Sequence, residues 1–212
     1  MPNRRTLLLA AGMLSLGALS ASPALAQALP GPDALVRQIS EEVIETVKAD
    51  KDIQAGNIPK IMALVDAKVM PHVNFPRMTA IAVGRPWRGA TPEQQKRLLE
   101  EFKTLLVRTY SGALTQVKDQ TVQLKPMRAG ADDPEVVVRT EVRGKGDPIQ
   151  LDYRLEKTDR GWKIYDVNVL GVWLADTSFK SQFAPIISSS GLDGLIANLA
   201  ELNRKAAAGG KR

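Results

Sequence analysis

Residues 149–156 read Ile149-Gln150-Leu151-Asp152-Tyr153-Arg154-Leu155-Glu156, an unbroken alternation of apolar and polar side chains. Successive side chains of a β-strand point to opposite faces, so this stretch predicts a strand with one apolar face and one wet face. Less regular alternation at 122–124, 136–142 and 162–174 predicts three further strands. Turn-forming glycine, proline and aspartate separate the four runs, which predicts hairpins and one antiparallel sheet within 119–175.

The last of these strands has an irregular pattern. Its apolar residues change face between Ile164 and Val167. An extra residue in one strand of an antiparallel pair has this effect, so we expect a β-bulge or a strong local twist there.

Upstream of the sheet, over 33–118, the apolar residues follow the helical period instead. Shorter helices are expected over 59–71 and 76–83, and a long one begins where Thr91-Pro92-Glu93-Gln94 combines an N-cap, a first-turn proline and a capping-box glutamine. The first helix, over 32–50, has apolar residues spaced for one buried face, namely Leu35, Ile39, Val43 and Val47.

After the sheet, two closing helices are expected over 176–188 and 192–203, and the tail over 204–212 is expected to fray. The chain has no internal repeat and no linker long enough to separate domains. We therefore predict one domain over 27–212 with an α+β fold. Its N-terminal helices pack on one twisted antiparallel sheet of about four strands, and the C-terminal helices close it.

Residues 1–26 have the pattern of a cleavable export signal. Arg4 and Arg5 precede an apolar stretch from 7 to about 19, and residues 22–26 offer a small-x-small cleavage site. The apolar stretch is short for a membrane anchor, which favours cleavage. The adjacent arginines also fit twin-arginine export. A periplasmic location is expected, and cleavage would lower the net charge from +6 to +4 because Arg4 and Arg5 are the only charged residues removed.

The composition excludes several kinds of site. The 212 residues contain no cysteine, which rules out disulfides, thiolate nucleophiles and thiolate metal ligands. The single histidine rules out a multi-histidine metal cluster. A modest charge and an aromatic content of 5% argue against a nucleic-acid partner, because such proteins rely on basic grooves and stacking aromatic side chains.

Few residues are candidates for catalysis. The sequence contains no Gly-x-Ser-x-Gly elbow, Walker loop or His-Glu-x-x-His pair. His72 could act as a general base, although a lone histidine is more often packed or capping. Tyr165 and Asp166 could form an acid–base couple; alternatively, Asp166 accepts backbone hydrogen bonds at the strand irregularity. Asp152 and Glu156, on the wet face, are expected to be solvated.

Two sets of residues resemble the MlaC family, also called the toluene-tolerance family of periplasmic phospholipid-binding proteins. The first set contains Val65-Asp66, Met70-Pro71-His72-Val73, Ala90-Thr91-Pro92-Glu93-Gln94 and Tyr110-Ser111-Gly112-Ala113-Leu114. The second contains Leu151-Asp152-Tyr153-Arg154, Gly161-Trp162-Lys163-Ile164-Tyr165-Asp166-Val167 and Gly191-Leu192-Asp193-Gly194-Leu195-Ile196. The match spans about 35–203 in unbroken order. One departure is Trp173, where many relatives carry a small polar residue.

The resemblance implies a nuclear-transport-factor-2-like fold, no enzymatic activity and no cofactor. It implies a deep apolar cavity that takes the acyl chains of a phospholipid and leaves the headgroup outside. The implied partners are an inner-membrane ABC transporter with an MCE-domain subunit and an outer-membrane lipoprotein complex, between which the lipid is carried. The lining that we expect consists of Val73, Met78, Ile81, Phe102, Leu106, Tyr110, Val138, Leu151, Tyr153, Val167 and Val169.

Two alternatives stay open at this point. One is an enzyme on the same fold that acts on a small apolar substrate, with Tyr165 and Asp166, or His72, as acid and base. The other is a scaffold protein with a solid core. Sequence alone does not separate a filled core from a cavity, because the same apolar side chains build both.

Overall fold

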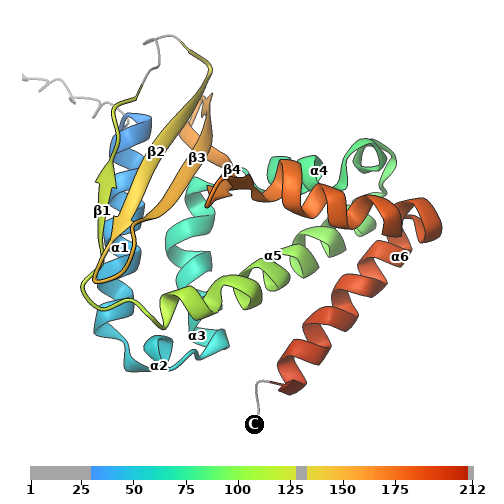
Figure 1. The fold of residues 1–212 in the computed structure, drawn as a ribbon. Coiled ribbons are helices and arrows are strands. Elements are labelled where there is room, and N and C mark those ends of the chain that lie inside the picture. Colours follow the sequence, from blue (N-terminus) through green and yellow to red (C-terminus); the bar gives the residue numbers. More distant parts are fainter. Residues whose placement is uncertain (1–29, 128–132, 210–212) are drawn as a thin grey trace, which may run out of the picture.

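The computed structural model describes residues 30–127 and 133–209, so the expected export signal over 1–26 lies outside the described residues. Helices come first, then the sheet, then helices again, and the α+β class is as predicted (Figure 1). The helices before the sheet are α1 (Pro32–Ala49), α2 (Lys51–Gln54), α3 (Ile58–Leu64), α4 (Phe75–Val83) and α5 (Pro92–Leu114). Short π- and 3₁₀-helical segments connect them: η1 (Val65–Val69), η2 (Met70–His72) and η3 (Arg85–Gly89).

The sheet is an antiparallel meander in which each strand pairs with the next along the chain. Its strands are β1 (Thr121–Leu124), β2 (Glu135–Arg143), β3 (Ile149–Thr158), β4 (Gly161–Val169) and β5 (Val172–Trp173). The predicted fourth strand over 162–174 is wrong in one respect. A turn at Leu170 and Gly171, both with positive φ, divides it into β4 and the short β5.

The predicted bulge is confirmed and lies at Tyr165. Arg154 of β3 pairs with Asp166 of β4, whereas the next residue, Leu155, pairs with Ile164. Tyr165 is therefore the extra residue that has no partner in the register. The bulge keeps Ile164 and Val167 on the same apolar face although three positions separate them.

Helix α1 lies along the apolar face of the sheet, beside β1 and β2 (Figure 1). The buried residues between them form a cluster that we call the sheet core: Leu35, Val36, Ile39, Val136, Val138, Leu155 and Ile164. Leu35, Val36 and Ile39 lie on one face of α1, and Val136 and Val138 lie on one face of β2. These two apolar faces pack against each other in a single layer.

A second cluster joins α4, α5 and the C-terminal segments, η4 (Leu174–Phe179) and α6 (Lys180–Gly209) (Figure 1). Phe102 of α5 lies at its centre, with its ring centroid 5.7 Å from that of Phe75, 4.9 Å from Phe179 and 5.4 Å from Phe183. We call this cluster the helical core: Phe75, Met78, Ala82, Val83, Leu98, Phe102, Ala175, Phe179, Phe183, Leu195, Ile196 and Leu199.

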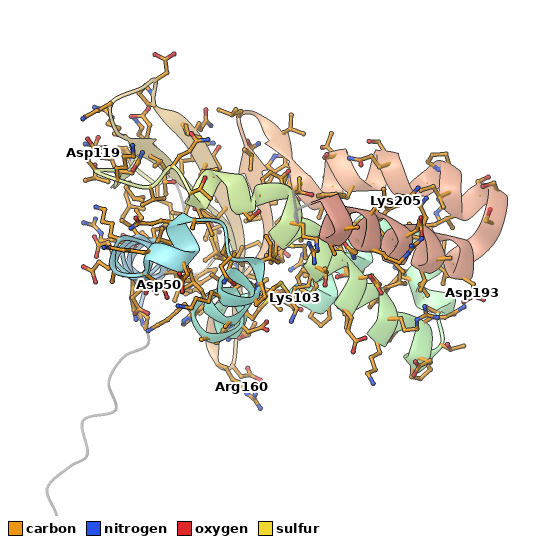
Figure 2. All side chains as sticks on the ribbon, turned by 90° about the horizontal axis from the view of Figure 1, so that it is seen from below. Asp50, Lys103, Asp119, Arg160, Asp193 and Lys205 are labelled. Carbon is orange, nitrogen blue, oxygen red and sulfur yellow. The ribbon has the colours of Figure 1, made fainter. Side chains whose placement is uncertain are left out.

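Helix α5 begins as predicted. The Thr91 hydroxyl accepts a hydrogen bond from the Gln94 backbone N–H, and the Gln94 side chain accepts one from the Thr91 N–H. Along the helix, the Lys103 ammonium donates to Asp66 of η1 over 2.7 Å, which ties α5 to the α3 side of the molecule (Figure 2 labels Lys103). The start of this long helix is thus fixed by local chemistry, and its middle is fixed by a neighbour.

The tail that we expected to fray from 204 onward is helical through Gly209, so that prediction is wrong. Asn203 explains the difference, because its amide donates to the backbone carbonyl of Glu101 over 2.9 Å and to the Glu101 carboxylate over 2.7 Å. The two expected closing helices are otherwise present, and a bend at Gly191 (φ 66°) separates them. Within the described ranges, no helix is both long and apolar enough to cross a bilayer.

Candidate functional site

Eight of the eleven expected lining residues gather at the two cores. Met78 and Phe102 belong to the helical core, and Val138 belongs to the sheet core. Ile81 and Leu106 are partly buried and pack against the helical core, and Tyr153 packs likewise against the sheet core. The remaining two, Val73 and Val167, contact both cores.

Val73 and Val167 therefore mark a seam between the sheet core and the helical core. Val73 forms an isolated parallel bridge to Ile164, and the Asn74 N–H donates to the Ile164 carbonyl over 2.8 Å, so the α3–α4 connection is attached to β4. Val167 lies opposite Tyr153 in the β3–β4 register. At the seam, the sheet core and the helical core meet through the apolar side chains of Val73 and Val167.

Apolar side chains near the seam keep accessible surface. Leu151 and Val169 are paired across β3 and β4, and Tyr110 lies on α5; all three are only partly buried and belong to neither core. Tyr153 is partly accessible too, although burial raises the pKa of its hydroxyl. These side chains therefore present apolar surface, and neither of the two hollows described below is lined by Leu151, Val169 or Tyr110.

The same incomplete cover extends along α5. Phe102 is buried, but Thr109 and Ala113, which lie two and three turns further on the same side of the helix, are exposed. On the side of α5 that carries Phe102, other elements therefore cover the helix at Phe102 but leave it exposed at Thr109 and Ala113.

Two surface hollows of about 330 Å³ each are found among the described residues. One lies along α1 among charged residues, including Asp33, Arg37 and Glu41. The other lies beside the β3–β4 turn and includes Val73, Asn74 and Lys163. Val73 is the one expected lining residue that borders either of these two hollows.

Tyr165 and Asp166 are engaged in separate hydrogen bonds rather than with each other. The Tyr165 hydroxyl donates to Glu135 over 2.8 Å, and burial, followed by the carboxylate of Glu135, raises the pKa of Tyr165 to about 12. The Asp166 carboxylate, which is fully buried, accepts backbone N–H groups from Val167, Ala175 and Asp176. Asp166 therefore anchors the start of η4 to β4, as the non-catalytic interpretation of this residue predicted.

Replacing Asp166 with asparagine is expected to lower the free energy of unfolding by about 2 kcal/mol. Both carboxylate oxygens accept N–H groups, and an amide NH₂ in place of either oxygen would face another donor. Burial also raises the pKa of the Asp166 carboxyl, against the opposing effect of its backbone N–H donors and Arg154. Urea denaturation of both proteins measures the difference. Equal midpoints would contradict the anchoring role.

The wet face of the sheet is less solvated than expected. Asp152 is only 5% exposed, and the Glu156 side chain accepts from Asn74 over 2.6 Å and pairs with Arg77. Arg77 also pairs with Glu135 over 2.6 Å. The prediction that Asp152 and Glu156 are solvated surface charges is therefore wrong. The start of α4 packs on Glu156, whereas Asp152 lies between Arg139 and Asn168 in the register and accepts from the Gln150 side chain.

His72 lies in η2 and is partly buried. Burial, followed by the positive charge of Lys163, lowers the pKa of His72, so its neutral form is favoured at neutral pH. Across the described ranges, no group of three or more acidic or histidine side chains could hold a metal ion. The carboxylate of Glu42 raises the pKa of His72, but its effect is smaller than those of burial and Lys163.

Trp173, the departure from the family pattern, lies away from the expected lining. It pairs with Asn168 in the register, on the polar side of the sheet, and its ring stacks on the guanidinium of Arg154 at 4.0 Å. Arg154 also approaches Asp176 at 3.3 Å. Trp173 therefore covers this polar network and does not face the seam.

The sequence interpretation missed the contribution of the C-terminal helices. Phe179 and Phe183 contact Phe102 directly, yet neither was among the expected lining or core residues. Their spacing of four residues, followed by Ile186 and Ile187, is the helical signal that could have indicated a buried face.

The fold and the seam define an α+β protein whose site offers apolar contact rather than a cluster of catalytic groups. The chain belongs to the MlaC family: the family model described as MlaC protein matches residues 37–201. It is 29% identical over 177 residues to toluene tolerance protein Ttg2D of Pseudomonas putida, covering 82% of this chain and 81% of that protein. It is 22% identical over 172 residues to the intermembrane phospholipid transport system binding protein MlaC of Haemophilus influenzae, covering 79% and 80%.

A solved structure has a similar fold. The phospholipid-binding protein from Ralstonia solanacearum, solved in complex with a phospholipid, superposes with a TM-score of 0.81 at 47% sequence identity. The match covers 84% of this chain and 99% of that one. The family resemblance and the α+β fold class that the sequence predicted are thereby confirmed.

Proposed function

We propose that this protein is a periplasmic phospholipid carrier that holds acyl chains at the seam between its sheet core and its helical core. The observation that carries the proposal is the match to the Ralstonia solanacearum protein in complex with a phospholipid, which extends over nearly all of that chain. The incompletely covered apolar side chains of α5, β3 and β4 support the location. The eleven expected lining residues remain part of this proposal.

The physics of lipid transfer fits an apolar seam. Burying hydrocarbon gives about 0.8 kcal/mol per CH₂, so one sixteen-carbon chain gains on the order of 12 kcal/mol when sheltered. Such a gain needs apolar contact and no metal or nucleophile. Release then requires the apolar site to open, and we place this opening at the seam, where the sheet core and the helical core are packed as separate clusters.

The proposed route runs between an inner-membrane ABC transporter with an MCE-domain subunit and an outer-membrane lipoprotein complex. The name of the Haemophilus influenzae relative, an intermembrane phospholipid transport system binding protein, supports this role. The expected export signal over 1–26 would place the carrier in the compartment between the two membranes. In this role the protein is no enzyme and carries phospholipid as cargo, not as a cofactor.

The test is native mass spectrometry of protein purified from the periplasm, with lipid extraction of the same sample. We expect a mass increase equal to that of one or more phospholipids, which extraction removes and identifies. A chain that is exported, folded and free of phospholipid would contradict the proposal. The mature N-terminus read from the same spectra tests cleavage after residue 26.

A further inference from the structure

An apolar patch lies at one end of the sheet. Among the described residues, five large apolar side chains are substantially exposed, and three of them meet at this end: Leu170 at 68%, Ile149 at 46% and Val172 at 45%. Ile149 begins β3, Leu170 lies in the β4–β5 turn, and Val172 begins β5. The Leu170 N–H donates to the carbonyl of Gln150, the residue after Ile149, so the turn is attached to the start of β3.

The backbone holds Leu170 outward. Its φ of 51° lies in the left-handed region, which costs energy for a leucine, and it is the one described non-glycine residue with positive φ. The next N–H, of Gly171, donates to Asn168 Oδ1 over 2.8 Å, and Asn168 is 6% exposed. A buried amide thus fixes a turn that presents an apolar side chain to the outside.

The patch continues the apolar face that leads to the seam. Val172 pairs with Val169, which pairs with Leu151. Two residues further inward on each strand, on the same face, are Val167 and its partner Tyr153. An unbroken row of apolar side chains therefore connects the exposed turn with the proposed site of the acyl chains.

The chemistry of the patch fits a lipid surface better than a protein partner. The patch consists of three exposed apolar side chains on one turn and on the two adjoining strand starts, an extent that suits shallow insertion at the headgroup boundary. An exposed apolar tip that continues into an apolar row is suited to enter the acyl boundary of a bilayer.

We propose that the Leu170 turn docks on the phospholipid bilayer itself, with Leu170, Val172 and Ile149 entering its acyl boundary. The inference rests on the proposed lipid-carrier function and adds the point of contact with the membrane. Docked in this way, the apolar row of β3, β4 and β5 gives an acyl chain a continuous path from the bilayer to the seam.

The test compares the mature wild-type protein with Leu170→Asn in co-sedimentation with vesicles of phosphatidylcholine and phosphatidylglycerol. Asparagine tolerates positive φ better than leucine, so this variant folds without added strain. We expect its vesicle affinity to fall on the order of tenfold, as loss of one inserted leucine predicts. The control is Leu202→Gln on α6, which removes a leucine of 45% exposure outside the patch and should leave vesicle affinity unchanged.

Absence of vesicle binding by the wild type, equal binding by Leu170→Asn, or equal loss in Leu202→Gln would each overturn the docking proposal. Binding of phospholipid delivered in detergent micelles is measured in parallel. Because it needs no docking, Leu170→Asn should bind micellar lipid as the wild type does. Failure of both proteins to bind micellar lipid contradicts the carrier function, and the vesicle result still decides the docking separately.

Discussion

Replacing Phe102 with alanine will lower the free energy of unfolding by about 3–5 kcal/mol, the range for truncating a buried phenylalanine. Phe102 is 1% exposed and touches three other phenylalanines, from α4, η4 and α6. Its loss removes the transferred apolar area, leaves a cavity, and breaks two edge-to-face contacts and one stacked contact. Urea denaturation of lipid-free protein, followed by circular dichroism, measures the change.

Two controls make this prediction specific. Leu202→Ala removes an exposed leucine and should change stability by no more than about 0.5 kcal/mol. Phe102→Leu keeps most of the volume and should cost clearly less than alanine. If Phe102→Ala unfolded at the same urea concentration as wild type, the helical core would not be centred on this ring.

Local signals were sufficient to predict most of the elements. The capping box at Thr91 and Gln94 fixed the start of α5, because each side chain satisfies the other's backbone N–H. Strict alternation predicted β3, and the change of face between Ile164 and Val167 predicted the bulge at Tyr165. Each of these features depends on residues within a few positions of one another.

Features that depend on distant residues were predicted poorly. The helix continues past Asn203 because Glu101, about a hundred positions away, accepts its amide hydrogens. Asp152 is buried although alternation correctly assigned it to the face opposite Leu151, because a strand pattern shows the face of a side chain and not what covers that face. The hydrogen-bond partners of Tyr165 and Asp166 were likewise decided by Glu135 and by η4.

The site itself was the least predictable part. An apolar lining carries no motif, since Leu106 or Val167 has the same chemistry in a solid core as against an acyl chain. The resemblance to the MlaC family suggested the lining that we propose, and the structure adds that Val73 and Val167 contact both the sheet core and the helical core. The partial exposure of a side chain such as Tyr153 depends on which distant residues pack against it, so it cannot be predicted from the sequence pattern.

Replacing Val167 with aspartate is expected to reduce phospholipid that co-purifies with the protein to less than about a tenth of the wild-type amount. A carboxylate at the seam would have to lose water against an acyl chain, which costs several kcal/mol without a paired cation. Val167 is only partly buried, so the aspartate keeps access to water in the lipid-free state and the fold survives. Leu106→Asp, on α5, should have the same effect from the opposite side.

The matched control is Val137→Asp on β2. Val137 is also partly buried, but it lies opposite Arg154 on the polar side of the sheet, so its aspartate has a cation nearby and no contact with the seam. This variant should retain phospholipid, as quantified by extraction and mass spectrometry, with circular dichroism confirming that all three variants are folded. Val167 lies on β4 and Leu106 lies on α5. If both Val167→Asp and Leu106→Asp lose the co-purifying phospholipid, the acyl chains lie between the sheet and α5. Wild-type amounts of lipid in both variants would instead exclude the seam as the binding site, even if the protein carries lipid elsewhere.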